Sequence, residues 1–220
     1  MFTQEKFNES CRQFHQKYVA AKKDISAIEH LGPYLTIPIE SEIKAAGSTE
    51  CRAGCIHCCY LRVVAFPHEI IAIYFFLKRT LTREQFIEVR TKIATQYAVI
   101  KPLSENEHFT TNIECPLLAG GCCSVYPVRP LACSGYHSTS EALCRDSYEN
   151  PEIMGMESGG IPMLHSVKEL HAIQHTIATE VISSEQDDLM QYEFIKGLHH
   201  VFNNPSLIQR WVSGRRFFSK

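Results

Sequence analysis

The sequence predicts a mostly α-helical protein, in which amphipathic helices pack around an irregular, cysteine-rich centre and a helical extension follows. Apolar residues recur every three or four positions on both sides of the centre, as amphipathic helices require. The centre itself has glycine and proline pairs and no helical period. With 45% hydrophobic and 21% charged residues, the 220-residue chain has an ordinary globular composition. We expect a single domain, with a cysteine-cluster core over 48–137 and the helical extension over 165–220.

The first thirty residues are predicted to form a helix. Four aromatic or small apolar residues are spaced four, three and four positions apart and so share one helix face: Phe7, Cys11, Phe14 and Tyr18. On that face Cys11 is expected to serve as a small core residue rather than as a metal ligand. Gly32-Pro33 is expected to end the helix, and a loop is expected to continue to Thr49.

Two helices are predicted within the central part of the chain. Pro67 suits the first turn of a helix, because its missing N–H has no partner there. The nearly continuous apolar run that follows, up to Lys78, marks this helix as the most buried one. Thr82-Arg-Glu-Gln85 fits a capping box and starts a second helix that runs toward Val99. The polar residues 101–114 are expected to form a loop.

Helices also dominate the segment after the centre. Ser138-Thr-Ser-Glu141 is expected to cap a short helix, and Ser166-Val-Lys-Glu169 is another capping box. Residues 150–164 contain glycines, prolines and methionines and are expected to form a loop. Further helices are predicted over 186–203 and after Asn204-Pro205.

Eight of the ten cysteines lie in two boxes, which we call the first box (51–59) and the second box (115–133). These cysteines are Cys51, Cys55, Cys58, Cys59, Cys115, Cys122, Cys123 and Cys133. Crowded thiols form either disulfides or a soft-metal site, and the redox compartment usually decides between them. Met1–Phe7 shows no basic segment leading into an apolar stretch, so we expect no signal peptide and a cytoplasmic location. We therefore expect the thiols to stay reduced and to bind metal.

The spacing of the first box lets its thiols converge. On a helix all four would lie within about 100° of one face. In an extended segment, Cys58 and Cys59 would instead point to opposite sides. Gly54 favours a loop that passes into a helix, and the second box supplies a further thiolate in either case. The quartet that we favour is Cys55, Cys58, Cys115 and Cys133. Three others either replace one of these ligands or form a second site: Cys51, Cys59 and Cys123.

Two kinds of metal centre suit four thiolates. Zn²⁺ takes four thiolates in closed, tetrahedral structural sites. An iron–sulfur cluster also takes four, and close cysteines completed by a Cys-Pro, here Cys115-Pro116, are typical of bacterial ferredoxins. The first gap of the first box and the distance to the Cys-Pro differ from that pattern. The spacing leaves both centres open, with a slight preference for the cluster.

The motifs of the two boxes follow a specific order within residues 48–137. They read Cys55-Ile-His-Cys58-Cys59, Cys115-Pro-Leu-Leu, Cys123-Ser-Val-Tyr126, Arg129-Pro130 and Cys133. This series resembles the YkgJ-type cysteine-cluster family, which is named for a CxxCxxCC signature and described as a zinc- or iron-chelating domain. The resemblance implies metal chelation. It also implies metal ligands at seven positions: Cys51, Cys55, Cys58, Cys59, Cys115, Cys123 and Cys133.

The sequence departs from the family pattern in several places. The first gap of the first box holds three residues instead of two, and Ser134 stands where the family usually has an arginine. Cys122 and Cys144 are additional cysteines, and we interpret them as neighbours of the site rather than as ligands. Four thiolates on Zn²⁺ leave a charge of −2, which favours a nearby cation. Arg129, held between Val128 and Pro130, is expected to have a structural or charge-balancing role there.

The remaining arginines and histidines are not expected to be the main metal ligands. Arg52 and Arg62 are expected to be ordinary surface arginines. His171 and His175 have the spacing of a zinc pair on one helix face, but a solvated helix face is the preferred interpretation. Two histidines near the boxes are weaker ligand candidates, His57 and His137.

The leading hypothesis is a metal-binding protein that holds an iron–sulfur cluster or zinc and has no known turnover. The resemblance also suggests a small methylase-like transferase, because a related flagellin lysine methylase carries a similar cluster. A third hypothesis is a zinc-stabilised scaffold for a protein partner. The net charge of −2 provides no field for nucleic acid. The longest apolar run, Ile70–Leu77, is too short to cross a bilayer, so we expect no membrane partner.

Overall fold

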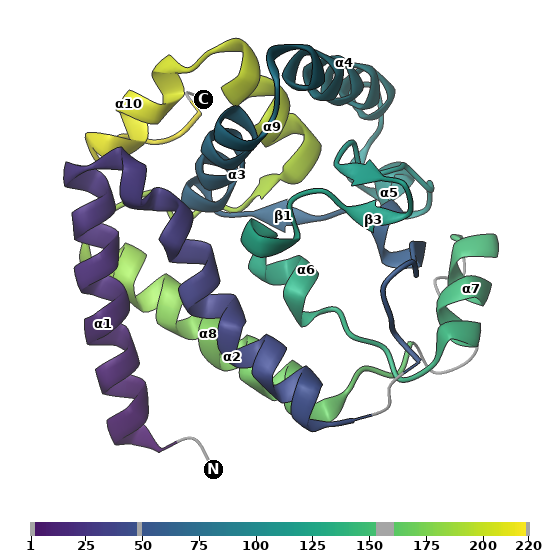
Figure 1. Ribbon diagram of the computed structural model, residues 1–220, viewed down its shortest axis with the longest axis horizontal. Coiled ribbons are helices and arrows are strands. Elements are labelled where there is room, and N and C mark those ends of the chain that lie inside the picture. The colour runs from purple at the N-terminus through teal and green to yellow at the C-terminus, as the bar shows by residue number, and fades with distance from the viewer. Residues whose placement is uncertain (1–2, 48–49, 153–160, 219–220) are drawn as a thin grey trace.

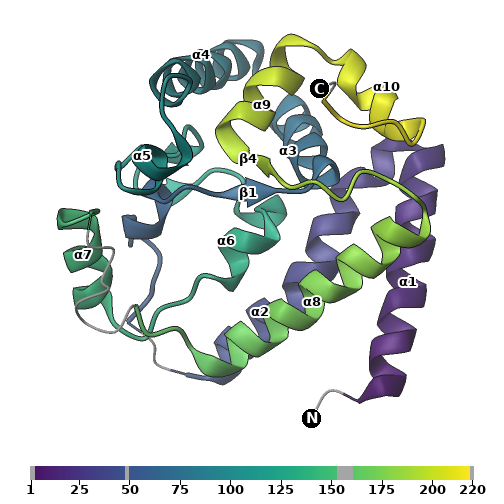
Figure 2. The same ribbon diagram turned by 180° about the vertical axis from the view of Figure 1, so that it is seen from behind.

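The computed structural model describes residues 3–47, 50–152 and 161–218. Helices account for most of these residues, and the strands among them are only two residues long. The prediction of a mostly α-helical fold is therefore confirmed. Figures 1 and 2 show α1 and α10 at one end of the molecule and α5 and α7 at the other. No helix in the described ranges is both long enough and apolar enough to span a membrane.

The N-terminal helix forms as its apolar spacing predicts. Helix α1 spans Gln4–Lys23, and its face buries Phe14 and Tyr18 completely. Cys11 packs beside them against the same core, as expected of a small core residue. Asp24 ends this helix and caps a short 3-10 helix, η1 (Ile25–His30), by accepting a hydrogen bond from the Ser26 N–H.

The loop that was predicted to follow Gly32-Pro33 is wrong. The chain instead forms helix α2 over Leu31–Ala45. The Gly-Pro pair lies in the first turn, where a proline needs no N–H, and Pro38 is accommodated inside the helix. Burial of Leu35 and Ile39 on one face offsets the weak helix propensity of this segment.

The central helices begin where their capping signals predict. Helix α3 (Pro67–Thr80) is buried along most of its length, and α4 (Arg83–Ile100) starts at the Thr82 capping box. The loop predicted over 101–114 is wrong in part, because it contains the short helix α5 (Glu105–Phe109). That helix has a capping box of its own, with Ser104 at the N-cap.

The second box contains a tight hairpin, in agreement with its predicted turn chemistry. Strands β2 (Leu118–Ala119) and β3 (Cys122–Cys123) pair antiparallel around Gly120-Gly121. Both glycines have positive φ, +57° and +76°, which the two central residues of this type of hairpin turn require. The box then continues through η3 (Tyr126–Val128) into the short helix α6 (Leu131–Gly135).

The C-terminal half adds helices on two sides of the core. Its elements are α7 (Glu141–Glu149), α8 (His165–Ser184), β4 (Tyr192–Glu193), α9 (Phe194–Asn203) and α10 (Ser206–Val212). The predicted short helix is confirmed, but its N-cap is Ser140, so the cap predicted at Ser138 is wrong. The predicted loop over 150–164 falls mainly on residues 153–160, which lie outside the described ranges.

Two further predicted helix starts in this half are wrong. The capping box at Ser166 does not form, because α8 begins one residue earlier and Leu164 occupies the N-cap. The helix predicted over 186–203 begins only at Phe194, because the preceding strand β4 pairs antiparallel with β1 (Val64–Ala65). The Glu193 carboxylate then caps α9 by accepting hydrogen bonds from the first turn of that helix.

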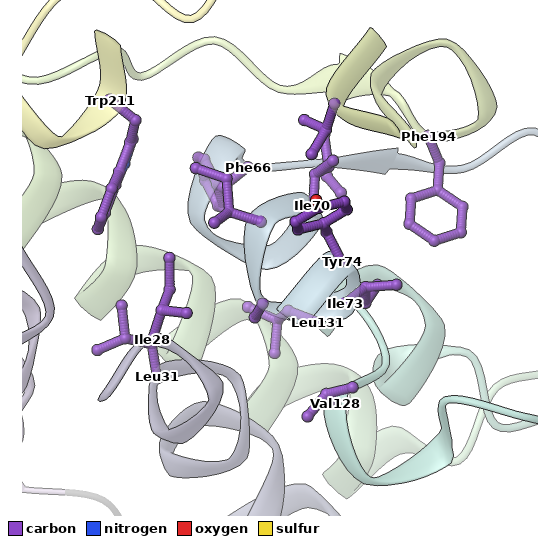
Figure 3. Packing of buried hydrophobic residues seen from close by; sticks show 14 of the residues in the cluster. Ile28, Leu31, Phe66, Ile70, Ile73, Tyr74, Val128, Leu131, Phe194 and Trp211 are labelled. Atoms are coloured by element: carbon purple, nitrogen blue, oxygen red, sulfur yellow. The ribbon is translucent and has the colours of Figure 1, made fainter. Parts of the chain in front are cut away.

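A single hydrophobic cluster joins both ends of the chain. It takes side chains from α1, α2, α3, α8, α9 and α10, and Figure 3 shows several of them gathered around α3. Val128 and Leu131, which precede the last cysteine of the second box, belong to this cluster as well. The second box is therefore attached directly to the core, whereas α7 lies at the edge of the molecule (Figure 1).

Candidate metal centre

The first box is an irregular segment that turns into a 3-10 helix, as Gly54 suggested. Gly54 has a φ of +89°, and the Cys55 N–H donates to the Arg52 carbonyl at 3.1 Å to close a turn. The chain then enters η2 (His57–Tyr60), in which Cys58 and Cys59 are successive residues. All ten cysteines lie in the described ranges, and none of them forms a disulfide bond.

Backbone hydrogen bonds hold the second box against the first. The Cys115 N–H donates to the Cys59 carbonyl at 2.8 Å. The β2–β3 register places Cys123 opposite Leu118, and the Ser124 N–H returns to the Leu117 carbonyl at 3.0 Å. Cys123 is therefore brought back beside Cys115, and both thiols pack against the hydrophobic core.

Four thiols from the two boxes form what we call the inner thiol group: Cys58, Cys115, Cys123 and Cys133. Burial raises the pKa of Cys133 well above its ordinary value, and the other three thiols raise it further. Burial likewise raises the pKa of Cys115 to about 12, with additional contributions from Cys123 and Cys58. These thiols are close enough to act on one another electrostatically and are protonated at neutral pH.

A buried glutamate fixes the helix that carries Cys133. Glu69 of α3 accepts hydrogen bonds from the Leu131 N–H and from the Phe66 N–H, both at 2.8 Å. Its side chain is 3% exposed, and burial raises its pKa to about 7 even though the two hydrogen bonds lower it. Sequence reasoning missed Glu69, whose position three residues after Phe66 in the first turn of α3 was the available signal.

Arg129 supplies positive charge beside the inner thiol group. It forms an ion pair with Glu40 of α2, and its guanidinium lies 4.1 Å from the centre of the Tyr126 ring. Its charge lowers the pKa values of Cys58, Cys123 and Cys133, against the larger effect of burial on the latter two. The Arg129 Nε is buried and has no hydrogen-bond partner among the described residues. A metal-bound thiolate would give this donor an acceptor.

A second set of thiols, the outer thiol group, lines a small cavity next to the inner one: Cys51, Cys55, Cys58 and Cys144. The cavity has a volume of about 10 Å³, and Tyr136, Ser138 and Glu141 complete its wall. Cys144 comes from α7 and was interpreted as a neighbour of the site. Cys58 belongs to both groups and therefore lies between them.

Residues 50–155 match the family model named CxxCxxCC, described as a "putative zinc- or iron-chelating domain". This stretch is a CxxCxxCC domain. The match confirms the resemblance carried by the boxes, and it runs beyond Cys133 to include α7 and Cys144. No curated protein and no solved structure was found to match the chain.

The other cysteines of the two boxes take other positions. Cys59 is partly exposed, and its thiol forms a hydrogen bond with the thiol of Cys58, which raises the pKa of Cys58. Cys122 is exposed on β3, on the opposite side from Cys123. Within the quartet that the sequence favoured, Cys55 lies in the outer group, whereas the other three lie in the inner group.

The two arginines expected at the surface differ from Arg129. Arg52 is 65% exposed and pairs with Glu141, at the N-terminus of α7. Arg62 is only 14% exposed, pairs with Glu105 at 3.1 Å and lies over the Phe109 ring, so it is not an ordinary surface arginine. Neither one stands beside the inner thiol group in the way that Arg129 does.

Three of the candidate histidines are more buried than expected. The solvated face predicted for His171 and His175 is wrong, because both are partly buried where α8 packs on α6. A Cβ atom added at Gly135 would lie 2.3 Å from the His171 ring, so the two helices approach closely here. His137 is 8% exposed near Arg129.

His57 lies in the first box and has a buried ring nitrogen. Its Nδ1 is buried and has no hydrogen-bond partner among the described residues. Its ring centre lies 5.7 Å from that of Tyr148 on α7. His57 therefore contributes to the packing of α7 against η2.

Neither thiol group of the CxxCxxCC domain forms a finished coordination shell. Across 3–47, 50–152 and 161–218, no three His, Cys, Asp or Glu side chains are arranged to hold a metal ion. Zn–S bonds are about 2.3 Å long, so side-chain rotation has to draw the sulfurs inward. The donor chemistry fits a soft metal, because the thiols lie together and Arg129 offers positive charge and an unpaired donor.

Proposed function

We propose that this protein binds a soft metal centre, Zn²⁺ or an iron–sulfur cluster, through the inner thiol group of its CxxCxxCC domain. The observation that carries the proposal is the convergence of Cys58, Cys115, Cys123 and Cys133 from separate segments onto one partly buried place. Four thiolates are the donor set that both kinds of centre take. The family description supports zinc or iron.

Metal binding would change the protonation of the inner thiol group. Because burial raises the pKa values of Cys115, Cys123 and Cys133, these thiols are protonated at neutral pH without metal. A thiolate is the form that binds metal, so binding must release protons, and the affinity must rise with pH. The positive charge of Arg129 beside these thiols reduces the free energy that is needed to deprotonate them.

The proposed role of the metal is structural, since it would join three short segments of the two boxes. The segments are η2, the β2–β3 hairpin with its preceding loop, and α6. Backbone hydrogen bonds connect them at Cys115 and Leu131 but leave short, irregular elements in between. A metal bound in the folded state alone contributes its binding free energy to folding.

Two adjacent cysteines on β3 provide a matched test. Cys123 belongs to the inner group, whereas Cys122 is exposed on the other side of the strand. The wild type, Cys123→Ser and Cys122→Ser would be purified without oxygen, and their metal content and visible spectra would be measured. We expect the wild type and Cys122→Ser to hold the same metal and Cys123→Ser to lose the metal of the inner group.

The same measurement separates the two kinds of centre. A coloured protein that contains iron and acid-labile sulfide supports the cluster, and a colourless protein with stoichiometric zinc supports Zn²⁺. Wild-type protein that holds neither metal, even after anaerobic reconstitution, would contradict the proposal. Equal metal content in Cys123→Ser and Cys122→Ser would contradict the ligand assignment.

A further inference from the structure

We propose that the outer thiol group binds a second soft metal ion, with Cys51, Cys55 and Cys144 as its own ligands and Cys58 as a thiolate shared with the inner group. This goes beyond the proposed function, on which it rests only through Cys58. It assigns Cys144, which the sequence had set aside as a bystander, to a metal site.

The cavity at the outer thiol group has the size of one ion. Its volume is about 10 Å³, close to the lower limit for holding a single water molecule, roughly 10–15 Å³. Four of the side chains around it carry a sulfur. Thiols are weak hydrogen-bond partners and would hold a water molecule poorly, whereas their thiolates bind soft metal ions strongly.

Helix α7 packs so that Cys144 faces the first box. Tyr148 lies one turn after Cys144 and therefore on the same side of the helix. The Tyr148 ring centre is 4.9 Å from that of Tyr60 and 5.7 Å from that of His57, both in η2. Cys144 is 8% exposed, which is consistent with a side chain turned toward η2.

Polar contacts tie the start of the first box to the start of α7. The Glu141 N–H donates to the Glu50 carboxylate at 2.7 Å, and Arg52 forms an ion pair with the Glu141 side chain. These contacts flank Cys51 on both sides in sequence. The two segments that supply the thiols are thus held together by these polar contacts as well as by the ring contacts of Tyr148.

The electrostatic effects among the thiols give the same grouping. Burial raises the pKa of Cys51 to about 11, and Cys58, Cys55 and Cys144 raise it further, in that order. The pKa of Cys144 is raised by burial and then by Cys55 and Cys58. The nearby Tyr136 hydroxyl also responds to Cys144, Cys58 and Cys51. Cys51 therefore has the other three thiols of the outer group as neighbours, and Cys144 has Cys55 and Cys58.

An ordinary packing role explains Cys144 less well. A buried free cysteine usually fills space as a small apolar side chain. Here the space beside Cys144 remains as a cavity, and three other thiols line it together with Tyr136, Ser138 and Glu141.

The test uses Zn²⁺ alone as the probe on reduced, full-length protein. Metal stoichiometry would be measured after removal of excess zinc for the wild type, Cys144→Ser, Cys123→Ser and Cys122→Ser. We expect two equivalents in the wild type and in Cys122→Ser, and one equivalent in each of the other two. A further variant, Cys58→Ser, is expected to weaken both sites.

The outcomes distinguish this inference from the proposed function. One equivalent in the wild type that Cys123→Ser loses and Cys144→Ser keeps would overturn the second site alone. One equivalent that Cys144→Ser loses and Cys123→Ser keeps would overturn the inner site alone, and no bound zinc would overturn both.

A measurement on the wild type avoids variants that do not fold. Reduced protein would be alkylated with and without Zn²⁺, and the modified cysteines would be identified by mass spectrometry. We expect zinc to protect Cys51, Cys55 and Cys144 strongly, while Cys122 is modified equally in both samples. Equal modification of Cys144 with and without zinc would overturn the second site.

Discussion

The inner and outer thiol groups differ in what holds them in place. The inner group is anchored to the hydrophobic core, because Leu131 and Val128 are core residues and Glu69 of α3 binds the start of α6. The outer group is anchored by surface polar contacts, such as Arg52 with Glu141, and by ring contacts of Tyr148. We therefore expect inner ligands to be coupled to global folding and outer ligands to the local docking of α7.

The two groups also differ in charge. Arg129 lowers the pKa values of Cys58, Cys123 and Cys133. The main charged influences on Cys51 and Cys144 are other thiols and, for Cys144, the Glu141 carboxylate, all of which raise their pKa values. Burial nevertheless raises the pKa values further in the inner group, to about 12 for Cys115 against about 11 for Cys51, so thiolate formation there depends more strongly on the metal and on Arg129.

The largest effect is expected from removing an inner ligand. Cys133→Ser should lower the free energy of unfolding by several kcal/mol, because the binding energy of a structural metal is part of the folding energy. Cys11→Ser, which alters a partly buried thiol on α1, should cost only about 1 kcal/mol. Chemical denaturation of metal-loaded protein measures both values. Equal losses in the two variants would show that the inner group is not coupled to folding.

A smaller loss is expected from the anchor of α6. Glu69→Gln leaves the amide oxygen to accept one hydrogen bond, so a buried N–H of Leu131 or Phe66 loses its partner. This should lower the free energy of unfolding by about 1–3 kcal/mol. It should also weaken zinc binding at the inner thiol group, which contains Cys123, more than at the outer thiol group, which contains Cys144. Denaturation and zinc competition assays measure the two effects. An equal loss of zinc affinity at both thiol groups would contradict the view that Glu69 supports the inner group alone.

The pH dependence of stability tests the role of the buried Glu69 carboxyl more specifically. Burial raises the pKa of Glu69 to about 7, so its contribution to stability falls as pH rises from about 4.5 toward 7. Burial lowers the pKa of the neighbouring His68 to about 3, so its contribution rises from about pH 3 to 6.5. The two trends oppose each other where they overlap. Denaturation midpoints should therefore rise more steeply with pH in Glu69→Gln than in the wild type, and parallel profiles would contradict this.

Next in size is the effect of the cation at the inner group. Arg129→Gln should weaken zinc binding at the inner site by about 10–100-fold, as is typical when a partner of the ligands is lost. Arg129→Lys keeps the charge and should be less damaging, although it loses the Nε donor. A competition titration with a chromophoric chelator measures both affinities. Unchanged binding in Arg129→Gln would show that the charge does not act on the thiolates.

The smallest effect is expected at the surface of the outer group. Arg52 is 65% exposed, and exposed ion pairs contribute little, so Arg52→Ala should change the free energy of unfolding by less than about 1 kcal/mol. Inner-site metal content should stay the same. Thermal unfolding and elemental analysis measure these quantities, and a loss of inner metal would mean that the two groups are not anchored separately.

Local signals in the sequence predicted much of the fold. The periodic face of Phe14 and Tyr18, the start of α3 at Pro67 and the capping box at Thr82 all depend on neighbours within a few residues. Helix α2 was missed because Gly32-Pro33 is a stop signal inside a helix and a start signal in its first turn. Its formation depends on tertiary burial of Leu35, which is not visible locally.

The candidate site was predictable in kind but not in grouping. The boxes identified the cysteines, yet spacing could not show that Cys123 turns back beside Cys115 through the hairpin. Cys144 reaches the outer group through the packing of α7 on η2. Glu69 acts on Leu131, a residue 62 positions further along the chain. Each of these facts depends on contacts between segments far apart in sequence.

X-ray absorption spectroscopy of the zinc-loaded wild type tests directly whether thiols alone hold the metal. We expect sulfur alone around the metal, at about 2.3 Å, because only thiols of the two groups are expected to bind it. In Cys144→Ser we expect fewer bound zinc ions but the same all-sulfur shell. Nitrogen or oxygen in the shell at about 2.0 Å would contradict binding by thiols alone. It would place an imidazole among the ligands, such as that of His57, whose buried Nδ1 has no hydrogen-bond partner within the described part of the chain.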